Sequence, residues 1–522
     1  MDRVFGAVGF LILVIVYRAY RRYTGISLAD VPGPDSPSFM MGMSQELYQG
    51  LAAEADFKWQ AQYGNVIRFK GPFNEDQLMI SDPAALQYIF VKLGYRFPKQ
   101  RERLAIAKVL NGKGVTWAAG EDHKRQRKVL SPGFGAPESK AFLPLFQGCA
   151  ESLSNKWMDI ITNSKEQSAV LNIPAWLSRA TLDAIGQAAF DVRFGSIDNK
   201  ESALARAYSN MMNDIFGSPS NGQILFREIS KYIPDRILQC LTETSNNPRI
   251  QRAREVASLA TSLAKQMVTD KAEMLLEGKG SRDVFSLLGV CTPSFRSSTS
   301  NRSTVKANMD TDAKEKLTEE ELETEAAIHA RGDAEFTVTD LDDMTYATAF
   351  MKEVLRFHPV VYQVYRCADQ DDVLPLSQPI TTRFGKVIYE LPVPKGTRIV
   401  ASLAAYNRNK DLWGDDAHVF NPERWINGAA NEKKATSIGV YSNLMTFLGG
   451  VRACIGWRFA VIEIQAFLTE VVGKFEFALT DQSGRVRREA SVVMTPTLEG
   501  EIEKGVQLPL RVSVAPLTEN GY

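Results

Sequence analysis

A ten-residue segment near the C-terminus limits most tightly what this chain can fold into. Residues 447–456 read FLGGVRACIG, and an apolar helical pattern follows directly. Gly450 and Gly456 allow the backbone to approach a flat ligand closely, and Arg452 offers a fixed cation to a carboxylate. Cys454 offers a thiolate, a soft ligand for iron, and backbone N–H groups near the start of the following helix stabilise negative charge on its sulfur. The segment therefore predicts a loop that presents a thiolate to a flat, iron-containing ligand.

The composition excludes several other classes of protein. The chain has 522 residues, 44% of them hydrophobic, with 61 Lys+Arg against 61 Asp+Glu, so it can bury a large core and has no bulk charge for binding nucleic acid. Its 5 cysteines are widely scattered, which argues against a disulfide framework and favours a reducing compartment. The 4 histidines show no HExxH pattern and no two cysteines have CxxC spacing, so a zinc-type site has little support.

The N-terminus carries an uncharged run over residues 4–17, with Arg3 before it and three arginines after it. As a helix the run would rise only about 21 Å, short of a hydrocarbon core, so the core of a signal peptide is the alternative to a membrane anchor. No small-residue cleavage site follows, and the arginines after the run predict that the rest of the chain faces the cytosol. We therefore expect a single membrane anchor at residues 1–23.

Helical periodicity dominates the body of the chain. From about residue 44 to residue 288 apolar residues recur at spacings of three and four, for example over residues 176–190. Short β-prone runs fall at residues 66–69, 78–80, 387–391 and 398–403. The predicted fold class is mainly α with small β-sheets. We expect a single large domain at residues 44–517, behind a linker at residues 24–43 that contains a Pro-Gly-Pro turn.

Two helices carry charged side chains at helical spacing. Glu353 and Arg356 lie three residues apart, on one face of a helix that we expect to begin near residue 339 or 340 and to stop at Pro359. An i,i+3 ion pair by itself is usually a solvated surface feature. His123 and Arg127 lie four residues apart and face one way, and an exposed basic helix is the alternative to a binding role. Spacing alone leaves both interpretations open.

The segment around Cys454 matches F-x-x-G-x-R-x-C-x-G, and through it the chain resembles the cytochrome P450 monooxygenase family. The resemblance runs from about residue 31 to about residue 517, includes a closing hairpin region at residues 496–500 and 507–512, and implies a P450-like fold. It implies haem b with Cys454 as the axial iron ligand. Further haem contacts are implied for Phe447, Gly450, Arg452, Gly456, His123, Arg127 and Arg366, the arginines and His123 holding the propionates. A buried network that locks the loop is implied for Glu353, Arg356 and Arg424.

The resemblance also implies an activity and partners. Members of this family insert one oxygen atom from dioxygen into a small, commonly apolar organic substrate, with electrons from an NADPH-dependent flavoprotein reductase. A basic patch of Lys124, Arg125, Lys128 and Arg458 would receive the reductase, although a merely solvated face is the alternative. By resemblance the anchor would hold the protein in the endoplasmic reticulum membrane, with the body on the cytosolic side. No nucleic-acid partner is expected.

One part of the family pattern is missing. Relatives carry a central helix with Ala/Gly-Gly-x-Asp/Glu-Thr-Thr, whose acidic and hydroxyl side chains deliver protons during oxygen activation. Here residues 289–340 form an atypical polar segment, first rich in Ser and Thr and then acidic, so no residue for proton delivery is identifiable. Residues 119–122, which read AGED, resemble the start of this central-helix pattern only by chance. Either the sequence is a faulty reading of its gene, or the chain is a real, impaired variant that binds haem poorly and does not turn over. Rearrangement of a peroxide, which needs no proton relay, is a third alternative.

Overall fold

The computed structural model describes residues 26–198, 203–208, 210–276, 284, 336–426 and 437–516. Helices make up most of the regular structure of these residues. Their strands form one four-stranded sheet, one three-stranded sheet and two two-stranded sheets. The predicted fold class, mainly α with small β-sheets, is therefore confirmed.

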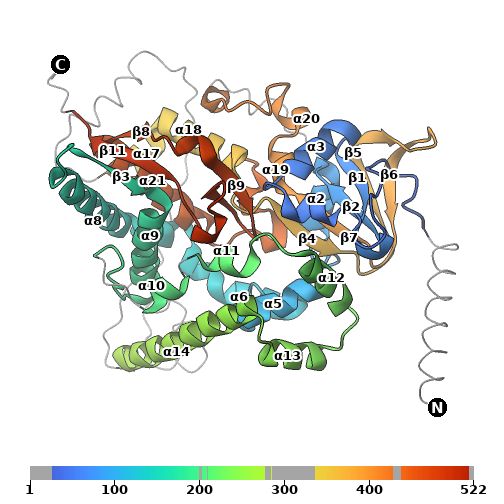
Figure 1. Ribbon diagram of the computed structural model, residues 1–522, viewed down its shortest axis with the longest axis horizontal. Coiled ribbons are helices and arrows are strands. Elements are labelled where there is room, and N and C mark those ends of the chain that lie inside the picture. The colour runs from blue at the N-terminus through green and yellow to red at the C-terminus, as the bar shows by residue number, and fades with distance from the viewer. Residues whose placement is uncertain are drawn as a thin grey trace, which may run out of the picture.

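Three long helices build one side of the molecule. These are α8 (Leu143–Thr162), α9 (Ile173–Phe190) and α21 (Trp457–Lys474), on the left of Figure 1. Phe146 of α8 is fully buried, and its ring meets that of Phe459 of α21 edge-on, with 4.7 Å between centroids. This packing removes apolar area from water and fixes α21, and so the end of the loop that precedes it, against the helical core. The helix predicted at residues 176–190 and the helix predicted directly after residue 456 are confirmed, α9 beginning earlier, at Ile173.

The four-stranded sheet occupies the other side, on the right of Figure 1. Its order is β1 (Val66–Lys70), β2 (Asp76–Ile80), β7 (Arg398–Ser402) and β4 (Gln363–Cys367), and only the β2–β7 pair is parallel. One face is covered by α2 (Ser44–Gln49) and α3 (Glu54–Tyr63), where Trp59 packs on Phe69 with 5.4 Å between ring centroids. Leu78 and Ile399 face a second core on the opposite side, as the period of two in a strand requires. The strands predicted at residues 66–69, 78–80 and 398–403 are confirmed.

The remaining strands form smaller sheets. They are the pair β5 (Asp372–Thr381) and β6 (Val387–Val393), the pair β9 (Val486–Ala490) and β10 (Met494–Leu498), and the sheet β3 (Ser168–Asn172), β11 (Pro509–Val514) and β8 (Phe475–Leu479). β6 contains the strand predicted at residues 387–391. The segments expected in a closing hairpin lie in different sheets, because β10 pairs with β9 while β11 pairs with β3 and β8. Gly500 and Gly505, both at positive φ, turn the chain between β10 and β11.

A further group of helices fills the middle and lower part of the view in Figure 1, where α14 and α13 form the lower edge. The group consists of α5 (Arg101–Asn111), α6 (Gly120–Leu130), α10 (Ala203–Tyr208), α11 (Met211–Phe216), α12 (Asn221–Ser230), α13 (Asp235–Thr244) and α14 (Pro248–Leu276), which is the longest helix among the described residues. α12 begins with a capping box, in which Ser220 Oγ accepts from the Gln223 backbone N–H at 3.3 Å and the Gln223 side chain accepts from the Ser220 N–H at 2.9 Å.

The helix expected between residue 339 or 340 and Pro359 consists of two pieces. α17 (Val338–Asp343) is capped by Thr337, whose Oγ1 accepts from the Asp340 N–H at 3.2 Å. Met344, with φ −70° and ψ 76°, interrupts the helical backbone before α18 (Thr345–Phe357). α18 carries both Glu353 and Arg356, so the interruption does not separate them.

The segment expected to be a linker, residues 24–43, packs on the body wherever it is described. Leu28 and Val31 are buried in the core beside the four-stranded sheet. The Arg68 N–H donates to the Pro32 carbonyl at 2.8 Å, and a Cβ on Gly33 would lie 1.7 Å from the Arg68 carbonyl oxygen. Gly33 is therefore required for the close passage of this segment along β1.

The predicted location needs correction. Among the described residues, no helix has both the length and the apolar character needed to cross a membrane. The anchor expected at residues 1–23 lies outside the described residues. Its uncharged run, residues 4–17, would rise only about 21 Å as a helix, against about 30 Å of hydrocarbon. A single N-terminal anchor in the endoplasmic reticulum membrane is therefore not supported, and the prediction is withdrawn. The polar segment expected at residues 289–340 also lies outside the described residues up to residue 335.

Candidate functional site

The loop that carries Cys454 is built from two short 3₁₀ turns, η6 (Met445–Phe447) and η7 (Gly450–Arg452). The Cys454 N–H donates to the Phe447 carbonyl oxygen at 2.8 Å, which closes the loop between its two ends. Leu448 adopts a positive φ of 57°, an uncommon conformation for a branched side chain. Cys454 is an exposed residue three positions before the first residue of α21, so the loop presents it at the surface, although the surrounding protein still partly desolvates the sulfur.

The two glycines of the loop have different tasks. Gly450 has φ +67°, and a Cβ there would lie 2.0 Å from the carbonyl oxygen of Phe90 in η2 (Tyr88–Lys92). A Cβ on Gly456 would meet only the Phe134 ring, at an ordinary 3.7 Å. Gly450 is thus required for packing against η2, and its approach to a flat ligand stays a prediction. At Gly456 no described atom requires a glycine.

The surroundings of the Cys454 sulfur act on its charge in opposite directions. Partial burial raises the pKa of the Cys454 thiol, while the backbone N–H of Gly456 and the Arg127 guanidinium act to lower it. Arg127, from α6, also donates through Nη1 to the Ala453 carbonyl oxygen at 2.6 Å. The predicted backbone support for the thiolate is thus present at Gly456, and Arg127 lies close to the thiol.

Five basic side chains gather beside this loop. The cation cluster consists of Lys99, His123, Arg127, Arg366 and Arg452. Burial, with Arg452 as a secondary cause, lowers the pKa of Arg366 to about 9. Burial, with Arg452 and Arg366 as secondary causes, lowers the pKa of Lys99 to about 8. No member has an acidic ion-pair partner among the residues that the structure describes. The cluster is therefore an environment that favours an anion.

His123 has a partner that the sequence did not point to. It is buried, and its Nδ1 lies 2.9 Å from the hydroxyl of Tyr95. If the tyrosine donates to Nδ1, Nε2 carries the proton and is free to donate to an acceptor. Burial, followed by the charges of Arg452, Lys99 and Arg127, lowers the pKa of His123 to about 4. The ring is therefore neutral near pH 7, and the positive charge of the cation cluster there comes from its lysine and arginines.

These residues fit a haem held through a thiolate. The porphyrin carries two carboxylates, and the buried Arg366 and the Nε of Arg452, a buried donor without a partner among the described residues, are suited to bind them. Cys454 supplies the soft ligand that iron prefers. Donors and thiol come together at the same loop, since Arg127 contacts Ala453, the residue next to Cys454.

The charged pair on α18 is part of a buried network. Glu353 and Arg356 are 0% exposed, and Arg356 donates to both carboxylate oxygens of Glu353, at 2.8 and 2.7 Å. Arg424, from η5 (Pro422–Trp425), donates to the same carboxylate at 3.2 Å. The backbone N–H of Asn421 and the indole of Trp425 complete the shell at 2.8 and 3.0 Å. Although burial opposes ionisation, these donors hold the pKa of Glu353 below its usual value.

Asn407 connects this network to the cysteine loop. Its carbonyl oxygen accepts from Arg356 Nη1 at 2.9 Å, and its side chain contacts the cysteine loop. Asn407 Oδ1 accepts from the Met445 N–H at 2.9 Å, and Nδ2 donates to Thr446 Oγ1 at 2.9 Å. The Thr446 hydroxyl in turn donates to the Leu355 carbonyl of α18 at 2.7 Å. The loop is therefore attached to α18 just before Phe447, whose carbonyl holds Cys454.

Replacing Asn407 with leucine should loosen the loop. The change leaves the Met445 N–H without its acceptor, which typically costs about 1–3 kcal/mol for a buried donor. We expect a loss of unfolding free energy in that range in chemical denaturation. The matched change Asn163→Leu, at an exposed asparagine that ends α8, should cost under about 0.5 kcal/mol. Equal losses for the two variants would show that Asn407 does not support the loop.

Several residues of this site are not apparent from the sequence. Lys99 and Tyr95 lie in an irregular stretch before α5 and carry no spacing signal. Asn407 ends α19 (Leu403–Asn407) and has no partner at helical spacing, and Asp416, which binds Arg424 at 2.8 Å, is a loop residue. Only contacts across long stretches of chain bring these side chains to the site.

The expected basic patch is partly neutralised on its own helix. Lys124 pairs with Glu121 at 2.5 Å and Arg125 with Asp122 at 3.6 Å, all four side chains being at least half exposed. Lys128 and Arg458 are exposed, and Arg458 stacks on the Trp457 ring at 4.1 Å. The uncompensated positive charge of the patch is therefore concentrated at Lys128 and Arg458.

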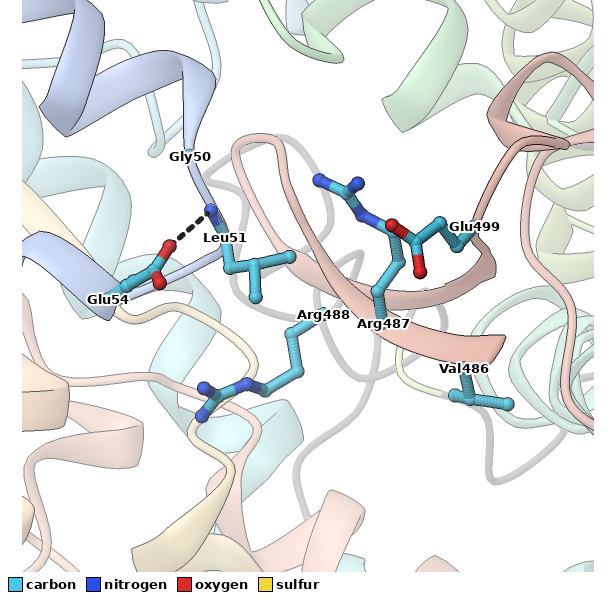
Figure 2. A pocket seen from close by; sticks show the side chains of 7 residues that line it. All are labelled: Gly50, Leu51, Glu54, Val486, Arg487, Arg488 and Glu499. Atoms are coloured by element: carbon cyan, nitrogen blue, oxygen red, sulfur yellow. Dashed lines mark hydrogen bonds between the residues drawn. The ribbon is translucent and has the colours of Figure 1, made fainter. Parts of the chain in front are cut away.

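A surface pocket of about 520 Å³ lies elsewhere in the molecule (Figure 2). It is lined by Gly50, Leu51, Glu54, Val486, Arg487, Arg488 and Glu499. Glu54 accepts from the Leu51 N–H at 3.3 Å. No residue of the cysteine loop or of the cation cluster lines this pocket, so it is separate from the site described above.

A mainly helical fold that presents a cysteine thiol beside a cation cluster defines a class of proteins that hold an acidic, iron-containing cofactor through sulfur. The family description "Cytochrome P450" matches residues 31–283 and 310–503. The chain therefore belongs to the cytochrome P450 family, and it is an enzyme of the P450 monooxygenase class, oxidoreductases that incorporate oxygen. The match is interrupted between residues 284 and 309. It resumes at residue 310, so it includes most of the later, acidic part of the polar segment.

Fungal P450 monooxygenases are similar over nearly the whole chain. Cytochrome P450 monooxygenase 205 of Postia placenta is 30% identical, over 93% of this chain and 92% of that protein. Cytochrome P450 monooxygenase 91 of the same organism is 29% identical, over 87% and 89%. Cytochrome P450 monooxygenase claU of Ampulloclitocybe clavipes is 28% identical, over 97% and 96%.

Proposed function

We propose that this chain is a haem-thiolate monooxygenase that inserts one oxygen atom from dioxygen into a small, apolar organic substrate. Cys454 is the axial ligand of haem b in this proposal. The observation that carries it is the placement of an exposed cysteine thiol, on a loop fastened to a buried charge network, beside cations that lack acidic ion-pair partners among the described residues. When bound, the haem supplies the iron at which dioxygen is activated.

The residues of the chain divide the remaining work. Arg452, Arg366, Arg127 and His123 bind the haem carboxylates, and Lys99 adds a fifth donor to that set. The Phe447 carbonyl oxygen accepts from the Cys454 N–H, which holds the backbone that carries the sulfur. Glu353, Arg356 and Arg424 keep the loop in place through Asn407 and Thr446. The cations would thereby hold the haem carboxylates, and the triad would keep the loop that carries Cys454 in place.

An NADPH-dependent flavoprotein reductase supplies the electrons in this proposal. Lys128 of α6 and Arg458 of α21 are exposed; α6 also supplies Arg127, which acts on Cys454, and α21 begins three residues after Cys454. A positive patch there suits an acidic partner and shortens the path for electrons to the thiolate side. Because Lys124 and Arg125 are partly neutralised by acidic neighbours, Lys128 and Arg458 provide most of the attraction for an acidic partner.

The experiment that tests the proposal measures NADPH oxidation by the haem-loaded chain with a fungal reductase and candidate apolar substrates. We expect substrate-stimulated oxidation that consumes dioxygen and is absent from Cys454→Ala. The double variant Lys128→Glu/Arg458→Glu should lower the rate at low salt about tenfold with an unchanged haem spectrum, because charge reversal slows steered association. Turnover that survives Cys454→Ala would contradict the proposal, and turnover insensitive to the double variant would remove the docking assignment.

One observation favours an alternative. The family match breaks between residues 284 and 309, within the interval where relatives carry the central oxygen-activating helix. The alternative is a family member that binds haem poorly and does not turn over. A chain that shows neither haem uptake nor NADPH oxidation, but gains both when a relative's central helix replaces residues 289–340, would establish it.

A further inference from the structure

Two helices next to the site are attached to the sheet by charge. α5 has no buried apolar side chain among those described, and in α12 Ile224 is the only one. A surface helix is ordinarily held by an apolar stripe that faces the core. Both helices instead direct a buried carboxylate, Glu102 from α5 and Glu228 from α12, toward Arg398 at the start of β7.

Arg398 binds both helices at once. Its Nη2 donates to Glu102 and its Nη1 to Glu228, and the three side chains are 9%, 4% and 3% exposed. Although burial opposes it, the two carboxylates raise the pKa of Arg398. Lys231, directly after α12, pairs with Glu228 and, at 2.6 Å, with Glu75 beside β2. Each carboxylate of the network thus has a cationic partner.

The same arginine reaches the cation cluster through one residue. Arg398 Nη2 donates to Gln100 Oε1 at 3.2 Å, and Gln100 Nε2 donates to the Arg366 carbonyl oxygen at 3.3 Å. The Gln100 carbonyl accepts from the Arg103 N–H at 3.1 Å, where α5 begins. Lys99, the preceding residue, belongs to the cation cluster. Gln100 therefore joins the network around Arg398 to two of the cations.

Stability alone does not account for such an arrangement. A buried ion network can often be replaced by apolar side chains of similar volume without loss of stability, because desolvation offsets the attraction. What charges supply is a defined geometry, since a guanidinium fork satisfies its partners only in one arrangement. The arrangement here fixes α5, α12 and the backbone of Arg366 relative to one another.

We propose that Arg398 is a positioning residue. It holds α5 and α12 on the sheet through Glu102 and Glu228, and through Gln100 it fixes Arg366 and Lys99 where they bind the haem carboxylates. The second half of this inference rests on the proposed function, whereas the first half does not depend on haem.

The first test is hydrogen–deuterium exchange of the full chain, which needs no haem. In Arg398→Met we expect backbone amides of α5 and α12 to exchange about tenfold faster or more. Without the charge-assisted contacts to Arg398, local opening of these helices costs less free energy. Amides of α8 and α21 should be unchanged. The control is Arg511→Met, in β11, whose pair with Glu166 is exposed and should leave both helices unaffected. Unchanged exchange of α5 and α12 in Arg398→Met would overturn the inference.

The second test measures haem release from the loaded chain to apomyoglobin. Arg398→Met and Gln100→Met should each release haem about tenfold faster, and the reduction potential of the iron should fall because the cations are less well placed. The double variant should release haem no faster than Arg398→Met alone, and Gln100→Met should leave exchange in α12 unchanged. Rates that multiply in the double variant would exclude the path through Gln100. If the unaltered chain takes up no haem, the proposed function fails, and the exchange result still decides whether Arg398 holds the helices.

Discussion

Replacing Arg356 with leucine is expected to lower the free energy of unfolding by about 3–5 kcal/mol and to remove most of the folded, haem-loaded protein. The change leaves the Glu353 carboxylate, which is 0% exposed, without the two donors at 2.8 and 2.7 Å that compensate its charge. It also removes the donor to the Asn407 carbonyl, and so the connection from α18 to the cysteine loop. Chemical denaturation followed by circular dichroism measures the first effect, and haem content per folded chain measures the second.

The control for this variant is an ion pair with the same spacing at the surface. Asp122 and Arg125 are also three residues apart on a helix, but their side chains are 69% and 70% exposed. Arg125→Leu should cost under about 0.5 kcal/mol, because water already screens that pair. If Arg356→Leu proved as mild as Arg125→Leu, the triad would not be what holds the loop.

Replacing Gly450 with alanine is the second change with a large expected effect, about 3 kcal/mol or more of stability together with loss of haem. The new Cβ would lie 2.0 Å from the Phe90 carbonyl oxygen and 2.8 Å from the Val91 Cα, both of them backbone atoms. A backbone atom cannot rotate away as a side chain does, so η7 must move off η2. Since η7 ends at Arg452, the displacement reaches Cys454. Haem retention and thermal unfolding of the variant measure the two losses.

Gly456→Ala provides the matched control in the same loop. Its Cβ would sit 3.7 Å from the Phe134 ring, and its φ of −95° suits any residue. The change should alter stability by under about 1 kcal/mol. If Gly456→Ala proved as damaging as Gly450→Ala, the loss would have to be assigned to the ligand side of the loop rather than to packing on η2.

Local spacing made much of this molecule predictable. The interval of three residues between Glu353 and Arg356 places both side chains on one face of a helix, and that geometry is independent of the rest of the fold. Short β-prone runs and helical periodicity likewise located β1, β2, β7 and α9. In each case the prediction depends only on the type and spacing of residues that are close together along the chain.

Features that depend on distant contacts were not predictable in the same way. Nothing in the sequence indicated that Gly450 is also required for packing against Phe90, from a helix more than three hundred positions earlier in the chain. Lys99 joins the cation cluster only because the fold brings its stretch beside Arg366 and Arg452. The family resemblance placed residues 496–500 and 507–512 in one closing hairpin, but β10 pairs with its neighbour β9, and β11 pairs with the distant β3.

The most direct test of the central claim, that Cys454 binds haem iron as a thiolate, is the difference spectrum of the reduced chain with carbon monoxide. It should be recorded on the full 522-residue chain and on Cys454→Ala, with haem content determined for both. The account predicts a strongly red-shifted Soret band that is lost in Cys454→Ala. A haem-loaded chain without that band, or a band that persists in Cys454→Ala, would contradict it.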